Sequence, residues 1–210
     1  MGRRSALAIV VASVICGPYA CTSSTPTPVD DEVCAGYPDW QSSRYVLPYA
    51  VGDAFAVIQG NCAPPGNGHR GVNRYGYDFG MSIGTEFVAA REGTIVQVEQ
   101  SHFDGQVAAT GLDNYIVVRH DDGTAALYGH LAHDGAAVSV GDVVRQGAVL
   151  GRSGNTGNTG NIPHLHFSVQ ACDPVTGGSA SCPTLPSTFR NTDANPGGLQ
   201  VGRTYRALPY

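Results

Sequence analysis

Short runs of apolar and β-branched residues, broken every few positions by glycine and aspartate, recur through most of the chain. Such runs are typical of β-strands joined by tight turns, and no long helical period accompanies them. The turn signals include "REG", "DDGT", "VGD" and "SGNTGNTGN", and the 28 glycines suit many such turns. We therefore predict an all-β protein, with strands among residues 86–90, 94–100, 114–120, 124–131, 143–151 and 164–169.

The run at residues 164–169 carries two histidines on one face of its predicted strand. Successive side chains of an extended chain point to opposite faces, so His164 and His166 share one face while Leu165 and Phe167 share the other. At this spacing one imidazole could bind a metal ion while the other reaches a water molecule on that ion. Histidine pairs also occur on ordinary surface strands, so a metal site requires further ligands.

Two further candidates lie upstream. Asp78 stands between Tyr77 and Phe79 in a sequence that otherwise predicts a strand. A carboxylate in such surroundings is costly to bury unless it is paired or bound to a metal ion, whereas an aspartate in a turn needs neither. His69 follows "PPGNG" and is by itself an ordinary loop histidine.

His130 is a third histidine on a predicted strand. Within residues 124–131, strand alternation puts Tyr128 and His130 on the same face, which makes His130 a candidate for the same site. The remaining histidines lie beside turn signals or in polar loops and are interpreted as solvated or structural: His102, His120 and His133.

The beginning of the chain has the pattern of an export signal. Arg3 and Arg4 precede the apolar run "ALAIVVASVI", which is too short to span a bilayer, and small residues follow up to Ala20. We therefore predict a signal peptide at residues 1–20 and a flexible, proline-rich tether at residues 21–31. The protein is expected to be exported, and to be periplasmic, anchored in the outer membrane or extracellular.

Cys21 allows two interpretations. It follows the small residue Ala20 and precedes the tether, as the acylated cysteine of a bacterial lipoprotein does. Pro18, however, stands where the lipoprotein pattern prefers leucine. A lipid anchor at Cys21 and ordinary signal cleavage therefore both stay open.

Cysteine usage fits an oxidising compartment. Cys16 lies in the predicted signal and Cys21 is the candidate for lipid, which leaves an even set for two disulfides: Cys34, Cys62, Cys172 and Cys182. No pair has the C-x-x-C spacing of a cysteine zinc site. Three connectivities are possible, and we favour Cys34 with Cys62 and Cys172 with Cys182, because short loops close at the least entropic cost.

Charge and lysine content exclude several functions. The formal net charge is −5 and all twelve basic residues are arginine, without clustered basic runs, so nucleic-acid binding is not expected. The absence of lysine excludes a P-loop, Schiff-base catalysis and a biotinyl or lipoyl carrier. The repeat "GNTGNTGN" is thus interpreted as a mobile turn or as a loop that walls a cleft beside His164.

The order of the motifs resembles a known family. His69, "YGYDF" with Asp78, "GTEFVAAREGTIV", "NYIVVRHDDGTAALYGHL" with His130, "VSVGDVVRQGAVLGRSGNTG" and "HLHF" look like the motifs of lysostaphin-type zinc metallopeptidases, also called LytM-domain peptidoglycan endopeptidases. The resemblance implies an antiparallel β-sheet sandwich or open barrel with a groove. It places a metallopeptidase core at residues 67–171, between an N-terminal extension at 32–66 and a C-terminal extension at 172–210.

The resemblance also implies a site. It assigns zinc to His69, Asp78 and His166, and catalytic roles to His130 and His164. Many members place the first histidine four residues before the aspartate, whereas His69 and Asp78 are nine apart, so His69 is the ligand that departs from the common pattern. A longer loop between two ligands is geometrically tolerable.

These residues suggest how the site would act. Two neutral imidazoles and one carboxylate leave zinc with a net positive charge, which lowers the pKa of bound water towards about 7. His164 would take the proton as general base and pass it to the leaving amine, while His130 or the metal would stabilise the oxyanion. The roles of His130 and His164 could be exchanged.

The predicted export and the family resemblance together suggest peptide crosslinks of peptidoglycan as the substrate. The protein is expected to be a monomer. Some tyrosines are candidates for the walls of the groove, although each could equally lie in the core: Tyr75, Tyr77, Tyr115 and Tyr128. The alternative function is a non-catalytic module that binds the cell wall and activates another hydrolase. The presence of all five expected polar side chains favours the enzyme.

Overall fold

The computed structural model describes residues 34–62, 68–105, 111–172 and 182–210, which fall within one compact unit, Glu32–Tyr210. The predicted signal peptide, the tether and the candidate lipid anchor at Cys21 lie outside the described residues. In the described ranges the helical elements are two 3-10 turns, η1 (Trp40–Ser42) and η2 (Gly71–Asn73). None of the described helices has the length and apolar character needed to cross a membrane.

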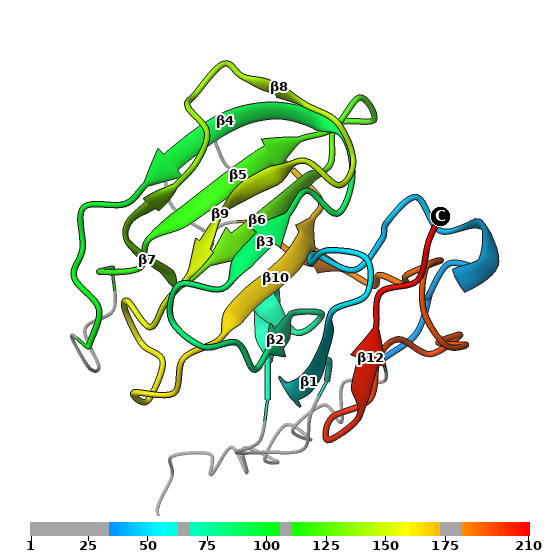
Figure 1. The fold of residues 1–210 in the computed structure, drawn as a ribbon. Helices are drawn as coiled ribbons and strands as arrows, with labels where there is room; N and C mark the ends of the chain where they lie inside the picture. The colour runs from blue at the N-terminus through cyan, green and yellow to red at the C-terminus, as the bar shows by residue number, and fades with distance from the viewer. Residues whose placement is uncertain (1–33, 63–67, 106–110, 173–181) are drawn as a thin grey trace, which may run out of the picture. The chain divides into compact units, whose positions relative to one another are not determined.

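Twelve strands form the described fold (Figure 1). They are β1 (Ala54–Gln59), β2 (Tyr77–Phe79), β3 (Glu86–Val88), β4 (Gly93–Glu99), β5 (Tyr115–Arg119), β6 (Ala125–Gly129), β7 (Leu131–Ala136), β8 (Val143–Val144), β9 (Val149–Ser153), β10 (Leu165–Gln170), β11 (Thr184–Leu185) and β12 (Thr204–Arg206). Each of the predicted runs contributes to at least one of these strands.

The strands form two antiparallel sheets. The larger sheet has the order β12-β1-β2-β10-β6-β5-β4-β8, with β11 also paired to β10, and the smaller sheet has the order β3-β9-β7. The pairings along both sheets are antiparallel. The predicted all-β, antiparallel fold is therefore confirmed.

The core lies between the two sheets. Phe87 of β3 stacks on Tyr128 of β6 with ring centroids 5.6 Å apart, and Phe167 of β10 meets the Tyr128 ring edge-on at 5.4 Å. All three side chains are fully buried. The Tyr128 hydroxyl also accepts a hydrogen bond from the Ala90 N–H at 2.8 Å, which satisfies its one polar atom in the core.

Both predicted extensions add strands to the larger sheet. β1 pairs with β2 on one side and with β12 on the other, so that Val57 opposes Phe79 and Phe55 opposes Tyr205. β11 pairs with β10, with Leu185 opposite Val169. β2, the strand that carries Asp78, is consequently paired on both edges, with β1 of the extension and with β10 of the core. The boundaries of the core and the extensions stay predictions.

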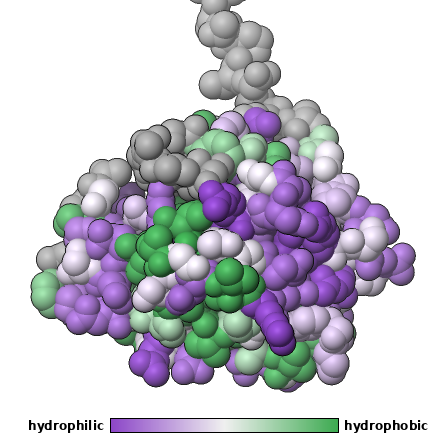
Figure 2. All heavy atoms as spheres, turned by 90° about the horizontal axis from the view of Figure 1, so that it is seen from above, coloured by the Kyte–Doolittle hydropathy of each residue, from purple (hydrophilic) through white to green (hydrophobic). Residues whose placement is uncertain are grey.

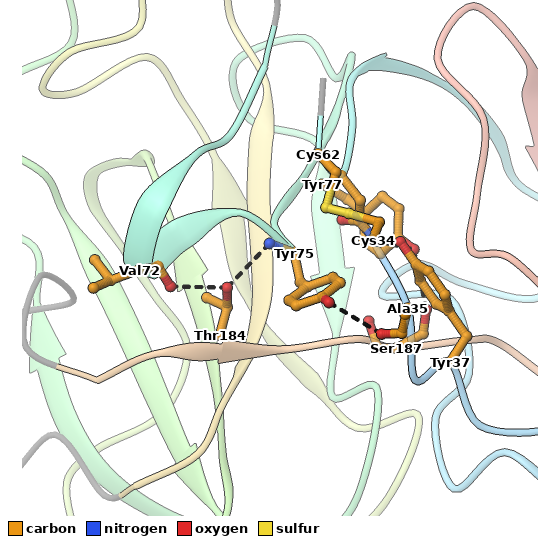
Figure 3. Close-up of a disulfide and its surroundings, with 10 residues drawn as sticks. Cys34, Ala35, Tyr37, Cys62, Val72, Tyr75, Tyr77, Thr184 and Ser187 are labelled. Carbon is orange, nitrogen blue, oxygen red and sulfur yellow. Dashed lines mark hydrogen bonds between the residues drawn. A yellow bond between two sulfur atoms is a disulfide. The ribbon is translucent and has the colours of Figure 1, made fainter. Parts of the chain in front are cut away.

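The disulfides join the cysteines in the favoured connectivity. Cys34 pairs with Cys62 and Cys172 with Cys182, with Cα atoms 5.9 and 5.7 Å apart. Figure 3 shows the Cys34–Cys62 bond beside the Tyr75 ring, whose hydroxyl donates to the Ala35 carbonyl at 3.0 Å. The disulfide closes a loop within the N-terminal extension, and the hydrogen bond from Tyr75 ties this extension to the segment just before β2.

Apolar side chains are also exposed on the surface. Figure 2 shows one face on which apolar residues, in green, lie beside polar residues, in purple. The largest exposed fractions among large apolar side chains of the described part belong to Val143 (81%) and Val140 (62%). Single exposed apolar residues are normal in globular proteins, so they do not assign a site.

Thr184 provides a test of how the segment before β2 is held. Its hydroxyl accepts from the Tyr75 N–H at 3.0 Å and donates to the Val72 carbonyl at 2.9 Å, as Figure 3 shows. Thr184→Val leaves the buried Tyr75 N–H without a partner, so the free energy of unfolding should fall by about 1–3 kcal/mol. Urea unfolding would measure this. Thr184→Ser keeps the hydroxyl and is the matched control; equal stability of the two variants would contradict the prediction.

Candidate metal centre

The site begins with a buried carboxylate in the middle of the larger sheet. Asp78 lies on β2, its side chain 4% exposed, and its neighbours Tyr77 and Phe79 point into the core. β10 pairs with β2 so that His166 stands directly opposite Asp78. The pairing therefore puts Asp78 and His166 side by side on the face away from the core, as alternation predicts.

Two imidazoles converge on the Asp78 carboxylate. His166 Nδ1 lies 2.9 Å and His69 Nε2 lies 3.3 Å from the same oxygen, Oδ1. The His69 and His166 rings meet edge to face with centroids 4.7 Å apart. One ligand atom from each of the three residues lies within 4.8 Å of the other two. Two imidazole nitrogens and one carboxylate oxygen are a donor set that suits zinc.

The protonation of these groups also suits a metal ion. Burial raises the pKa of Asp78, but hydrogen bonds to His166 and His69 lower it by more. The carboxyl pKa therefore lies well below its ordinary value. Burial lowers the pKa of His166 to about 4 and outweighs the hydrogen bond to Asp78, which raises it. At neutral pH an ionised carboxylate therefore faces a neutral imidazole, which are the states that bind a metal ion.

Two more histidines flank this trio. His164 Nε2 lies 3.5 Å from Asp78 Oδ2, and its Nδ1 lies 2.7 Å from the Ile162 carbonyl. His130 Nδ1 lies 2.8 Å from the Thr156 carbonyl, and its ring centroid lies 4.7 Å from that of His164. A carbonyl accepts only, so each Nδ1 carries the proton, and each Nε2 of a neutral ring carries a lone pair.

The two flanking imidazoles differ in basicity. Burial lowers the pKa of His164 below its ordinary value, although the charge of Asp78 opposes this effect. Burial also lowers the pKa of His130, but a hydrogen bond to Asp113 and the charge of Asp78 raise it by more, so the net shift is upward. His164 is thus the ring that stays neutral, and His130 the ring that holds a proton more readily.

His130 reaches the site by a route that the alternation of strands does not predict. The expectation that Tyr128 and His130 share a strand face is wrong: Tyr128 lies in the core, while the His130 ring lies beside His164. The reason is that β6 ends at Gly129 and His130 has a φ of 62°, in the left-handed region. This break turns the His130 side chain to the face that carries His166.

The other residues singled out from the sequence lie outside this cluster. His120 is buried, with its Nδ1 2.7 Å from the Glu92 carbonyl, and His133 stacks on Phe103 at 4.0 Å. Tyr75, Tyr77 and Tyr128 are buried, which contradicts their candidacy as groove walls. Tyr115 is partly buried against the small apolar cluster of Val117, Ala125 and Leu127.

Two contacts of His130 were not foreseen: the Thr156 carbonyl and the Asp113 carboxylate, whose Oδ1 lies 3.3 Å from His130 Nδ1. Thr156 belongs to the "GNTGNTGN" repeat, which therefore contacts the site through His130. In the sequence Asp113 is an acidic residue directly before a predicted strand. Aspartates in turns are common at such places, so this position alone does not indicate a role in the site.

Comparison with known proteins identifies the family. The sequence profile described as "Peptidase family M23" matches residues 72–178. The chain belongs to this family. The M23 match includes Asp78, His130, His164 and His166, whereas His69 lies just before it. The family resemblance expected from the motifs is confirmed.

Relatives of this M23 chain include two staphylococcal proteins. Glycyl-glycine endopeptidase ALE-1 of Staphylococcus capitis is 38% identical over 101 residues, which are 48% of this chain and 25% of the relative. Lysostaphin of Staphylococcus simulans is 39% identical over 101 residues, which are 48% of this chain and 18% of the relative. The matches thus span a quarter or less of these relatives.

A solved structure of the catalytic domain of lysostaphin from Staphylococcus simulans is also similar. It is 30% identical in sequence with a TM-score of 0.42, and the match covers 62% of this chain and 86% of that domain. The roles of the individual site residues of the M23 chain stay predictions at this point.

Gly76 makes the proximity of His69 and His166 testable. A Cβ atom at position 76 would lie 2.8 Å from His166 Cε1 and 3.1 Å from His69 Cγ, so Gly76→Ala must displace these rings. We expect zinc affinity to fall by roughly 10- to 100-fold, as when a metal site loses its supporting geometry. Competition with a chromogenic chelator would measure this. Gly197→Ala, where no atom lies within 4 Å of the added Cβ, is the control. Equal zinc affinity in both variants would contradict the arrangement.

The lowered pKa of His166 predicts a pH dependence of stability for the metal-free chain. As the pH falls from about 6.5 to about 4, the His166 ring takes up a proton in the unfolded chain but not in the folded chain. Lower pH therefore favours the unfolded state. Across this window His166 lowers the free energy of unfolding by about 3 kcal/mol, and above it His166 causes no such loss. Unfolding in a chelator, compared between the natural chain and His166→Gln, isolates this contribution; parallel curves would show that His166 does not cause it.

Proposed function

We propose that the chain is a zinc metalloendopeptidase that hydrolyses peptide crosslinks of bacterial peptidoglycan. The observation that carries the proposal is the convergence of His69 and His166 on the buried Asp78, with His130 and His164 beside them. Membership of peptidase family M23 supports a peptidase, and a relative named a glycyl-glycine endopeptidase supports a peptide crosslink as substrate.

His69, Asp78 and His166 would hold the metal ion. Their nitrogen and oxygen donors fit zinc, and the surrounding sheet excludes most solvent from the carboxylate. Zinc, when bound, supplies a Lewis acid that acidifies water and polarises a carbonyl group. Three protein ligands leave a coordination position for water or substrate, which a purely structural four-ligand site lacks.

His164 would act as the general base. Its pKa is lowered by burial, so the ring is neutral near pH 7, and the Ile162 carbonyl fixes the proton on Nδ1. Nε2 then has the lone pair that accepts the proton of the attacking water and returns it to the leaving amine. Nε2 also points to the metal site, since it lies 3.5 Å from Asp78 Oδ2.

His130 would stabilise the charge that develops on the carbonyl oxygen. Its raised pKa favours a protonated ring, and such a ring donates from Nε2 to an oxyanion. In the exchanged assignment His130 is the base and His164 the donor. The opposite pKa shifts of the two rings support the first assignment.

We also propose that the protein is exported and acts as a monomer. Four cysteines in two disulfides support an oxidising compartment. The signal peptide at residues 1–20, the anchor at Cys21 and the choice among periplasm, outer membrane and medium stay predictions.

The test is digestion of purified peptidoglycan by the zinc-loaded protein. Hydrolysis of a peptide bond should release free amino groups without new reducing sugar ends, and a chelator should abolish release until zinc is restored. A non-catalytic activator would release no amines alone yet would accelerate an added cell-wall amidase. That second outcome, across several crosslink chemistries, would overturn the peptidase proposal.

Single variants separate the ligands from the base in the same assay. Asp78→Ala and His166→Ala should lose both zinc and activity, because two remaining side chains hold the ion poorly. His164→Ala should retain zinc and lose turnover. A zinc-free His164→Ala variant beside a zinc-loaded His166→Ala variant would reverse the assignment of these two histidines.

A further inference from the structure

Asp113 lies beside Nδ1 of His130, on the side of the ring opposite Nε2, the proposed oxyanion donor. The Asp113 carboxylate oxygen Oδ1 lies 3.3 Å from His130 Nδ1, next to the Thr156 carbonyl, which lies 2.8 Å from the same nitrogen. The Nδ1 proton of His130 is therefore shared by a neutral acceptor and an anion. The Asp113 side chain is about one-third exposed, at 35%, whereas the His130 side chain is 14% exposed.

The backbone around Asp113 is fixed by its neighbour Asn114. The Asn114 side-chain amide donates to the Ala132 carbonyl at 3.2 Å, and the Asn114 N–H donates to Thr156 Oγ1 at 3.0 Å. Thr156 Oγ1 in turn donates to the Leu131 carbonyl at 2.8 Å. Asn114 and Thr156 are both buried. The segments that carry Asp113, His130 and Thr156 are thus joined by hydrogen bonds.

Gly157 leaves the space that the Asp113 carboxylate occupies. A Cβ atom at position 157 would lie 1.9 Å from Asp113 Oδ1. The φ of Gly157 is also +75°, a conformation that side chains with a Cβ disfavour. The neighbouring Asn158 N–H donates to the same oxygen at 3.4 Å. The first glycine after Thr156 therefore permits the approach of the carboxylate to His130.

The charge of Asp113 suits a partner of His130. Burial raises the pKa of Asp113, but its hydrogen bond to His130 and the charge on that ring lower it by more, so Asp113 is ionised. A carboxylate behind an imidazole selects the tautomer with the proton on the near nitrogen and stabilises the imidazolium form. Thr156 alone would orient the ring without supplying this charge.

We infer that Asp113 is a positioning residue of the peptidase site, holding His130 through Nδ1 so that Nε2 faces the reacting carbonyl. The inference rests on the proposed function, because it concerns the step that His130 serves. Asp113 does not contact the three proposed metal ligands through any hydrogen bond or ion pair among the described residues. Its loss should therefore change turnover and spare zinc binding.

Steady-state cleavage of a crosslink peptide by the zinc-loaded full chain tests the inference. Asp113→Asn keeps the shape and removes the charge, and we expect kcat to fall at least about tenfold while KM and zinc content stay within about twofold. Asp193→Asn removes an exposed aspartate that pairs with Arg203 and is the matched control for charge. It should keep the natural kcat.

Gly157→Ala supplies a second, independent perturbation. The added Cβ must displace the Asp113 carboxylate, so kcat should fall as in Asp113→Asn, again without loss of zinc. Gly160→Ala controls for backbone strain, because Gly160 has a similar φ of +58° but no atom within 4 Å of an added Cβ. Equal kcat values for Gly157→Ala and Gly160→Ala would count against the carboxylate contact.

The outcomes separate the inference from the proposed function. An active natural chain together with an Asp113→Asn variant of undiminished kcat overturns the inference and leaves the peptidase proposal intact. A loss confined to KM, or one accompanied by equal loss of zinc or of folded protein, also overturns it. A natural chain that cleaves no crosslink overturns the proposed function, and the role of Asp113 in turnover with it.

Discussion

The burial of one carboxylate requires the surrounding structure to supply partners for its charge. Asp78 sits in the middle of the larger sheet, between core aromatics on its own strand, where an ionised group without partners would be strongly destabilising. The structure compensates by directing imidazole nitrogens at both carboxylate oxygens rather than by supplying an arginine. A neutral imidazole offers no full positive charge, so a metal ion held by this cluster would complete the compensation.

The two halves of the site are assembled by different means. Strand pairing fixes Asp78 against His166, and this arrangement follows from the register of β2 and β10 alone. His130 instead lies at a break between β6 and β7, and its ring is held by contacts with the loops that carry Thr156 and Asp113. Two of the proposed metal ligands, Asp78 and His166, therefore rest on the sheet, whereas the orientation of His130 rests on loops.

Much of the first half could be predicted from the sequence. Alternation along a strand put Leu165 and Phe167 in the core and His164 and His166 on the other face, and loop-closure entropy favoured the observed disulfides. Alternation failed at His130 because a single positive φ reverses the face, and a positive φ is uncommon for any residue other than glycine. The Asp113 contact was missed because it depends on two loops that meet only in three dimensions.

The strand order bears on when the site can form during folding. β1 lies between β2 and β12, so residue 54 opposes residue 206, and Asp78 opposes a histidine 88 positions later in the chain. Pairings between such distant segments close large loops, and they form late and slowly compared with hairpins. The hairpin of β5 and β6 can form locally, but the sheet around Asp78 needs nearly the whole described chain. A partly synthesised chain would therefore lack the assembled cluster of Asp78 and its histidines.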